Sequence, residues 1–292
     1  MDEGVDGDQG LAAALWRRPR ARLGLLLAGP LGWLVVAYLG SLAVLLVAAF
    51  WRLDPFTGEV VRGFGLENFG TLAEGAVYRQ IVARTVGLAA AVTVTDALLA
   101  FPIAFLMAKV AGPRARGILL VAVLMPLWSS YLVKVYAWRT ILSENGILNW
   151  ALEPLGLSGP GFGVVALWLV FSYLWLPYMI IPIYAGLERI PSSLLDASGD
   201  MGATPATTFR RVILPLAFPA VVAGSIFTFS LTLGDYIAPT LVSSTQFIGN
   251  VVYANVGVAN NLPLAAAFAT VPVAVMVAYL LVARRLGAFD RL

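Results

Sequence analysis

The sequence predicts an all-α membrane protein that crosses the bilayer six times. Of its 292 residues, 60% are hydrophobic, and the mean hydropathy is +0.86. Only 12% are charged, whereas soluble domains hold about a quarter of such residues. The chain also contains six apolar stretches near the length of a membrane span, which is about 20 residues. A soluble fold of this size has no place to bury so much apolar surface.

The first apolar stretch, residues 23–50, has 28 residues and no charge. It is much longer than the core of a signal peptide, about 7–15 residues, so we expect a retained membrane helix. Two of the later spans contain one acid each, Asp96 and Asp235, and the third is interrupted by Lys134. The later spans are predicted at residues 85–107, 118–138, 164–187, 216–242 and 263–283.

The predicted organisation is a single membrane domain with one added helix. Residues 80–286 hold the five-helix core and a cytoplasmic loop at 188–215, and residues 23–50 add the first helix. The outer segments, 51–79, 139–163 and 243–262, are polar or rich in glycine and are expected to be less regular. Residues 1–22 and 287–292 are predicted cytoplasmic tails.

The basic residues predict that both termini lie in the cytoplasm. Cytoplasmic loops carry an excess of Lys and Arg, and an even number of spans puts both termini on one side. That side holds thirteen basic residues: Arg17, Arg18, Arg20, Arg22, Lys109, Arg114, Arg116, Arg189, Arg210, Arg211, Arg284, Arg285 and Arg291. The other side holds six: Arg52, Arg62, Arg79, Arg84, Lys134 and Arg139.

Several kinds of chemistry are excluded by composition. The chain has no cysteine and no histidine, so sites that need Cys or His ligands and Ser-His-Asp triads are excluded. Neither lysine, Lys109 or Lys134, follows a glycine in the way that a phosphate-binding loop requires. A net charge of +3 gives no electrostatic support for nucleic acid binding. We therefore expect no catalytic residue, metal or cofactor on this chain, and ATP only on a separate subunit.

The most informative segment is the cytoplasmic loop at residues 188–215. Pro191 suits the first turn of a helix, and Leu194, Ala197, Ser198 and Met201 follow at helical spacing as one small, apolar stripe. Gly202 is expected to end this helix. Thr204 and Pro205 then resemble an N-cap and a first helical residue, which predicts a second short helix that ends at Arg211.

This loop resembles the EAA loop of type I ABC importer permeases, whose pattern is E-A-A-x-x-x-G, nine residues, I-x-L-P. The matching residues are Asp196, Ala197, Ser198 and Gly202, followed after nine residues by Val212-Ile213-Leu214-Pro215. The departures are Asp for Glu, Ser for Ala and Val for Ile. The resemblance implies that Asp196, Ala197, Ser198, Gly202, Leu214 and Pro215 form a coupling helix that docks on an ATPase subunit.

The resemblance continues over residues 80–286 and favours one subgroup. Residues 126–138, 144–149, 233–241 and 248–250 resemble spermidine/putrescine permeases. This implies a polyamine substrate, although importers of ferric iron, thiamine, opines and phosphonates share much of the pattern. It also implies a bacterial inner-membrane location, ATPase subunits, an external binding protein and a second permease, with a heterodimer favoured.

The candidate translocation pathway follows from polar and aromatic residues near the outer ends of two spans: Asp235, Tyr236, Trp128, Ser129 and Tyr131. Ionisable groups inside membranes usually face protein or water. Asp235 could therefore line the pathway or form a structural hydrogen bond, and for Asp96 a helix–helix hydrogen bond is expected. The aromatic cluster is typical of an interfacial belt, or of a rim on which a binding protein docks, with Lys134 and Arg139 pairing with its acids.

A secondary transporter that works alone is the alternative from another class. Such carriers often contain inverted repeats, and this sequence has none that we can detect. Two intramembrane acids are also few for ion-coupled transport. A structural scaffold would leave the patterned loop at 188–215 without a purpose, so the importer permease is the prediction we retain.

Overall fold

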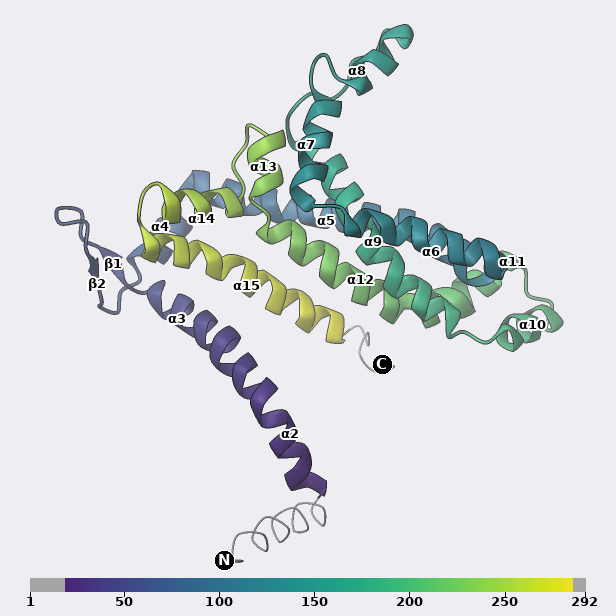
Figure 1. Cartoon of the computed structure of the whole chain (residues 1–292). Coiled ribbons are helices and arrows are strands. Elements are labelled where there is room, and N and C mark those ends of the chain that lie inside the picture. The colour runs from purple at the N-terminus through teal and green to yellow at the C-terminus, as the bar shows by residue number, and fades with distance from the viewer. Residues whose placement is uncertain (1–18, 286–292) are drawn as a thin grey trace, which may run out of the picture.

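A computed structural model describes residues 19–285, and these form a helical bundle with two long projections (Figure 1). Within this range, five helices are long and apolar enough to cross a membrane, or six if one bent pair counts as a single span. The predicted all-α class and the number of spans are therefore confirmed. Residues 1–18 and 286–292 lie outside the described residues, so the tails predicted at 1–22 and 287–292 fall largely or wholly there.

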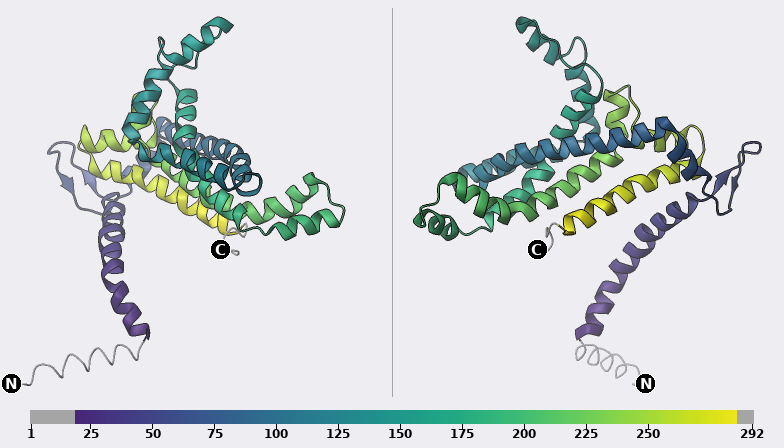
Figure 2. Two further views of the ribbon diagram at one scale, coloured as in Figure 1. Left: turned by 45° about the vertical axis from the view of Figure 1, so that its right-hand side comes forward. Right: turned by 180° about the vertical axis from the view of Figure 1, so that it is seen from behind.

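The first span is one long helix made of α2 (Pro19–Trp33), a π-helical segment (Leu34–Gly40) and α3 (Ser41–Ala48). It leans away from the bundle in both views of Figure 2, and only 6% of its apolar window is buried within the chain. Ala48 and Ala49 at its outer end pack on Ala266 and Ala267. Its apolar surface is thus left for lipid or for another subunit.

The core consists of four helices that lie side by side in Figure 1. They are α5 (Ala76–Phe105, continued by Leu106–Val110), α9 (Val164–Glu188), α12 (Leu214–Gly234) and α15 (Leu262–Arg285). Helix α9 is central because its apolar residues face neighbours on several sides. Its outer half joins a cluster around Phe171 and Leu174, and its inner half joins a second cluster around Met179 and Ile183.

Two predicted spans are wrong as continuous helices. The third, at 118–138, is divided into α6 (Pro113–Trp128) and α7 (Tyr131–Leu142), which meet at 92°. The fifth, at 216–242, ends with α12 at Gly234, and a separate short helix follows, α13 (Ile237–Val242). In both places the apolar pattern continues across the break, while the backbone at Ser129 and at Asp235 is extended.

The outer segments contain more regular structure than expected. Residues 51–79 form a hairpin of β1 (Arg52–Leu53) and β2 (Val60–Val61), followed by α4 (Glu67–Glu74). Between the strands, the Asp54 carboxylate accepts hydrogen bonds from the backbone N–H groups of Phe56 and Thr57. Residues 139–163 include α8 (Ile147–Leu152) and a 3-10 turn (Glu153–Leu155), and residues 243–262 include α14 (Ile248–Gly257). Helix α14 was missed because only Ile248 and Val251 are buried.

The loop at 188–215 lies at the far end of the bundle from the hairpin (Figure 1). It contains α10 (Ser192–Asp200) and α11 (Pro205–Thr208). The prediction that the second helix ends at Arg211 is wrong. It continues through a π-helical segment (Phe209–Ile213) directly into α12, so Pro205–Gly234 is one helix of 30 residues.

Candidate functional site

The loop at 188–215 is a rigid elbow. Gly202 has a φ of +75°, a left-handed conformation that side chains with a Cβ rarely adopt. After the elbow, the Thr204 side chain accepts a hydrogen bond of 3.3 Å from the backbone N–H of Thr207 and so caps α11. The hydroxyls of Ser198 and Thr208, 2.8 Å apart, join the two arms. The predicted glycine elbow and threonine cap are thus both present.

The stripe expected on α10 does not face the bundle. Ser198 is 4% exposed, whereas Leu194 is 45% exposed and Met201 is 81% exposed. Ala197 and Asp196 are also exposed. The stripe therefore points outward, where another chain can contact it, and Ser198 alone turns inward to brace the elbow.

The two broken spans meet at a hydrogen bond. Tyr131, the first residue of α7, donates its hydroxyl proton to Oδ2 of Asp235, which ends α12. The other carboxylate oxygen accepts the backbone N–H of Ala238 at 3.0 Å, in the first turn of α13. Asp235 therefore holds both breaks together. The sequence left two roles open for Asp235, and the structural hydrogen bond to another helix is present.

Helix α14 supports this junction from the side. Asn250 donates from its Nδ2 to the backbone carbonyl of Tyr236 at 3.2 Å and to Oγ1 of Thr240 at 2.7 Å. Gly249 packs so closely that a Cβ there would come within 2.8 Å of the Asp235 carbonyl carbon. The Ile248-Gly249-Asn250 string therefore lets α14 approach the break and hold the Tyr236 backbone.

A pocket of about 350 Å³ opens beside the junction, lined by Gly234, Tyr236, Gly249, Tyr253 and neighbouring apolar residues of α14 and α15. The rings of Tyr236 and Tyr253 stack in it, with centroids 4.8 Å apart. They are 39% and 54% exposed, so part of each residue is accessible to a ligand or a neighbouring chain.

A row of aromatic rings leads away from the junction along α9. Tyr131 stacks on Trp175 with centroids 6.0 Å apart, and Trp175 contacts Tyr178 at the same separation. Tyr178 in turn stacks on Phe227 of α12 at 6.4 Å. Trp175, Tyr178 and Phe227 were not singled out from the sequence, whereas Asn250 lies in the 248–250 string that was. The signal available was the aromatic spacing within α9, which a buried core helix also shows.

Other predicted residues have different positions. Trp128 is 84% exposed, and the Ser129 hydroxyl donates to the Pro126 carbonyl, so within residues 19–285 neither side chain bonds to Asp235. Lys134 also donates to the Pro126 carbonyl, at 3.1 Å, which satisfies the end of α6. Asp96 is fully buried, and neither of its carboxylate oxygens has a hydrogen-bond partner by geometry among residues 19–285.

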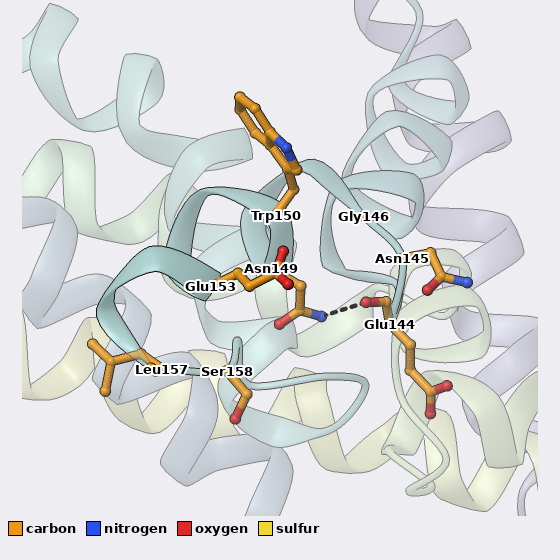
Figure 3. Close-up of a pocket in the computed structure, with 9 residues that line it drawn as sticks. Glu144, Asn145, Gly146, Asn149, Trp150, Glu153, Leu157 and Ser158 are labelled. Atoms are coloured by element: carbon orange, nitrogen blue, oxygen red, sulfur yellow. Dashed lines mark hydrogen bonds between the residues drawn. The ribbon is translucent and has the colours of Figure 1, made fainter.

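Helices α7 and α8 project from the bundle as an arm (Figures 1 and 2). A pocket of about 590 Å³ lies near its tip, lined by Glu144, Asn149, Trp150, Glu153 and nearby residues. In Figure 3 the Asn149 side chain bridges to the Glu144 backbone carbonyl, while Trp150 points away from the pocket floor. Trp150 is 74% exposed and Leu155 is 71% exposed. The arm therefore presents acids and apolar rings together.

Comparison with protein families gives one match over most of the chain. Residues 69–290 match the family described as binding-protein-dependent transport system inner membrane component. The inner membrane ABC transporter permease protein YdcU of Escherichia coli K12 is 46% identical over 293 residues, which is 95% of this chain and 93% of that protein. The spermidine/putrescine transport system permease protein PotB of Haemophilus influenzae is 30% identical over 208 residues, 69% of this chain and 72% of that one.

Solved structures share the fold at low identity. A subunit of a bacterial ABC transporter that imports the acidic polysaccharide alginate aligns with a TM-score of 0.71 at 19% identity, over 94% of this chain and 98% of that chain. The alginate transporter in complex with a periplasmic protein bound to an alginate pentasaccharide gives 0.73 at 17% identity, over 97% and 98%. The MetNI methionine transporter gives 0.56 at 17% identity, over 72% and 94%.

Proposed function

Since this chain belongs to the family of binding-protein-dependent transport inner membrane components, the permeases of ABC importers, we propose that it forms half of the translocation pathway for a polyamine such as spermidine or putrescine. The family is a non-catalytic membrane component. In this proposal ATP is bound and hydrolysed by separate ATPase subunits, and no cofactor or metal is held here. A second, homologous permease supplies the other half of the pathway as a heterodimer.

The loop at 188–215 is the proposed contact with the ATPase. Its exposed stripe on α10, with Asp196, Ala197 and Met201, offers a small and partly apolar surface that fits a groove. The Gly202 elbow and the Ser198–Thr208 hydrogen bond make the loop stiff. Because α11 continues into α12 without a break, one helix transmits a push on the loop into the membrane, through Leu214 and Pro215.

The arm of α7 and α8 is the proposed contact with an external binding protein. It projects sideways from the bundle, since α7 meets α6 at 92°, and it ends in exposed Trp150 and Leu155. Aromatic residues are enriched in the centres of protein interfaces. On this view both termini are cytoplasmic, as the distribution of Lys and Arg predicts.

The charge at the junction supports a cationic substrate. Within residues 19–285 the two ion pairs are Arg52–Glu67 and Arg116–Glu188, so Asp235 has no basic partner there. Its two hydrogen bonds, from Tyr131 and Ala238, leave lone pairs that an ammonium group can use. Because Coulomb attraction strengthens as the dielectric falls, a fixed carboxylate at this depth favours the entry of a di- or tri-cation.

The aromatic residues beside Asp235 support the same substrate class. Ammonium groups are attracted to the faces of Trp and Tyr rings within about 6 Å, and methylene segments gain from contact with apolar walls. The partly exposed pair Tyr236–Tyr253 offers such faces. Each contact is weak, so a polyamine would be attracted without being trapped.

Uptake of radiolabelled spermidine tests this proposal. Cells that carry the whole operon should accumulate spermidine faster than cells without it, in a saturable way that unlabelled putrescine competes with. Equal uptake by the two strains, together with saturable uptake of a neutral or anionic solute that requires the operon, would overturn the polyamine assignment. The importer assignment would remain in that case.

A further inference from the structure

The start of the cytoplasmic loop is hydrogen-bonded to two helical segments that do not adjoin it in the sequence. The loop joins α9 to α12 along the chain, while α5 and α6 precede it by many residues. Yet Lys109, at the end of the α5 span, donates a hydrogen bond of 2.5 Å from Nζ to the backbone carbonyl of Ile190. Ile190 is buried and directly precedes Pro191, where α10 begins.

Arg116, in the first turns of α6, completes this contact. Its Nη1 lies 3.2 Å from Oε1 of Glu188, the last residue of α9. Its Nε and Nη2 donate to the carbonyls of Met107 and Ala108, at 3.1 and 3.3 Å. One guanidinium thus joins α9, α6 and the end of the α5 span. We call the set of Lys109, Arg116 and Glu188 the root clamp.

The root clamp fixes the relative position of the helix ends and adds little to the folding stability of the chain. Tyr184 donates to the same Glu188 oxygen at 3.0 Å and fixes the carboxylate from the α9 side. The Arg116–Glu188 pair is partly exposed, at 34% and 49% of each side chain, and exposed ion pairs add little to folding stability. A planar guanidinium that reaches three acceptors nonetheless holds them in one arrangement.

We propose that Lys109 and Arg116 are positioning residues for energy coupling, because they make α5 and α6 move with the loop when the ATPase displaces it. This inference rests on the proposed docking of the loop. Without the root clamp, a displaced loop would carry α9 and α12 but could slide past the ends of α5 and α6. The remaining links between the α5 span and the loop would be apolar: the edge contact of Phe101 with Phe209, centroids 5.4 Å apart, and the buried cluster that Met107 shares with Ile190 and Ile213.

The test uses the purified complex of this chain with its second permease and ATPase. The variants are Lys109→Met and Arg116→Gln, with Lys109→Arg as the conservative substitution. Arg114→Gln is the matched control, because Arg114 is an exposed arginine of the same α6 turn with no side-chain hydrogen bond within residues 19–285. Stimulation of ATP hydrolysis by the binding protein is measured together with complex assembly.

A charge-assisted hydrogen bond contributes on the order of tenfold to an equilibrium constant. We therefore expect Lys109→Met and Arg116→Gln to reduce stimulation about tenfold while unstimulated hydrolysis continues. Lys109→Arg and Arg114→Gln should retain it. Stimulation equal to wild type in both Lys109→Met and Arg116→Gln overturns the inference.

A second measurement does not depend on a variant that must fold. Spin labels at Ser193 on α10 and Ala115 on α6 should keep one distance with and without ATP in the otherwise wild-type chain, since the two segments move together. A distance that changes with ATP overturns the inference. Gly202→Val separates the two proposals. If it abolishes stimulation while Lys109→Met and Arg116→Gln both keep it, only the root clamp is wrong. If none of the three variants has an effect, the docking role of the loop is wrong.

Discussion

Tyr131 and Asp235 are 104 residues apart in sequence, and the hydroxyl of the first donates a hydrogen bond to the carboxylate of the second. Each stands where a membrane helix is interrupted, Tyr131 at the start of α7 and Asp235 at the end of α12. One side-chain bond therefore sets the relative position of two interrupted spans. An acid is costly to bury in a membrane, and two neutral donors, the Tyr131 hydroxyl and the Ala238 backbone N–H, hold this one in place.

Replacing this charge should reduce transport without preventing folding. Asp235→Asn keeps the shape and an oxygen that can accept from Tyr131, but it removes the negative charge. We expect the initial rate of spermidine uptake to fall at least about tenfold, because hydrogen bonds to charged groups contribute about 1.5–3 kcal/mol. The measurement is uptake in cells, with copurification of the ATPase as the check on assembly.

Tyr131→Phe tests the hydrogen bond separately from the charge. It keeps the Asp235 charge and removes one of its two anchors, so we expect a loss of stability of about 1 kcal/mol and a smaller loss of uptake than in Asp235→Asn. If Tyr131→Phe instead matches Asp235→Asn in uptake, the hydroxyl itself is needed for transport, and the separation of anchor from charge is incorrect.

Gly249 should resist enlargement more than another glycine of the same helix. A Cβ at position 249 would lie 2.8 Å from the Asp235 carbonyl carbon and 3.0 Å from Cβ of Tyr236, so α14 must shift. Overpacking of this kind costs about 1–3 kcal/mol. Gly257→Ala is the control, since a Cβ there meets nothing within 4 Å. Thermal unfolding in detergent should show a lower midpoint for Gly249→Ala alone.

The elbow of the loop makes a prediction about conformation. Gly202 has a φ of +75°, which a β-branched residue adopts only at a cost of about 1–3 kcal/mol. Gly202→Val should therefore insert normally yet lose ATP-driven uptake, while Gly202→Asn should retain most of it because Asn tolerates this conformation. Asp196→Lys should also lose uptake by reversing a charge at the ATPase contact. Wild-type uptake by Gly202→Val would refute the role assigned to the elbow.

The topology can be tested without removing any native cysteine, because the chain has none. Ser158, beyond the arm, and Ser193, in the loop at 188–215, are both exposed, and each can be replaced by a single cysteine. An impermeant thiol reagent added to intact cells should label the first and not the second. Labelling of both from outside contradicts the orientation.

Sequence reasoning succeeded where one long apolar run makes one helix, as in α9 and α15, and where local backbone rules apply, as at Gly202 and Thr204. It failed at the two breaks. The segments before and after Ser129-Ser130 and Asp235 are apolar, so the hydrophobic pattern predicts one continuous span across each break. The breaks depend on partners distant in sequence, such as Tyr131 for Asp235 and Asn250 for Tyr236. The polar residues Ser129, Ser130 and Asp235 were the local signals of interruption.

Which of the candidate pathway residues lie together could likewise be predicted only in part. Tyr131, Asp235 and Tyr236 do come together, because the two breaks meet, whereas Trp128 is exposed and separate. Tyr253, which stacks on Tyr236, was not identified, since its position depends on how α14 folds back over the junction. Tertiary contact, which no local pattern encodes, decides which aromatic residues flank the carboxylate.

The central claim is that an ATP-driven importer moves a polycation past Asp235. Its most direct test is spermidine accumulation in proteoliposomes that contain the purified complex, with the binding protein outside and ATP inside. We predict saturable accumulation that requires both ATP and the binding protein and that falls sharply in Asp235→Asn. ATP-dependent accumulation of a neutral or anionic solute, unaffected by spermidine and by Asp235→Asn, would contradict it.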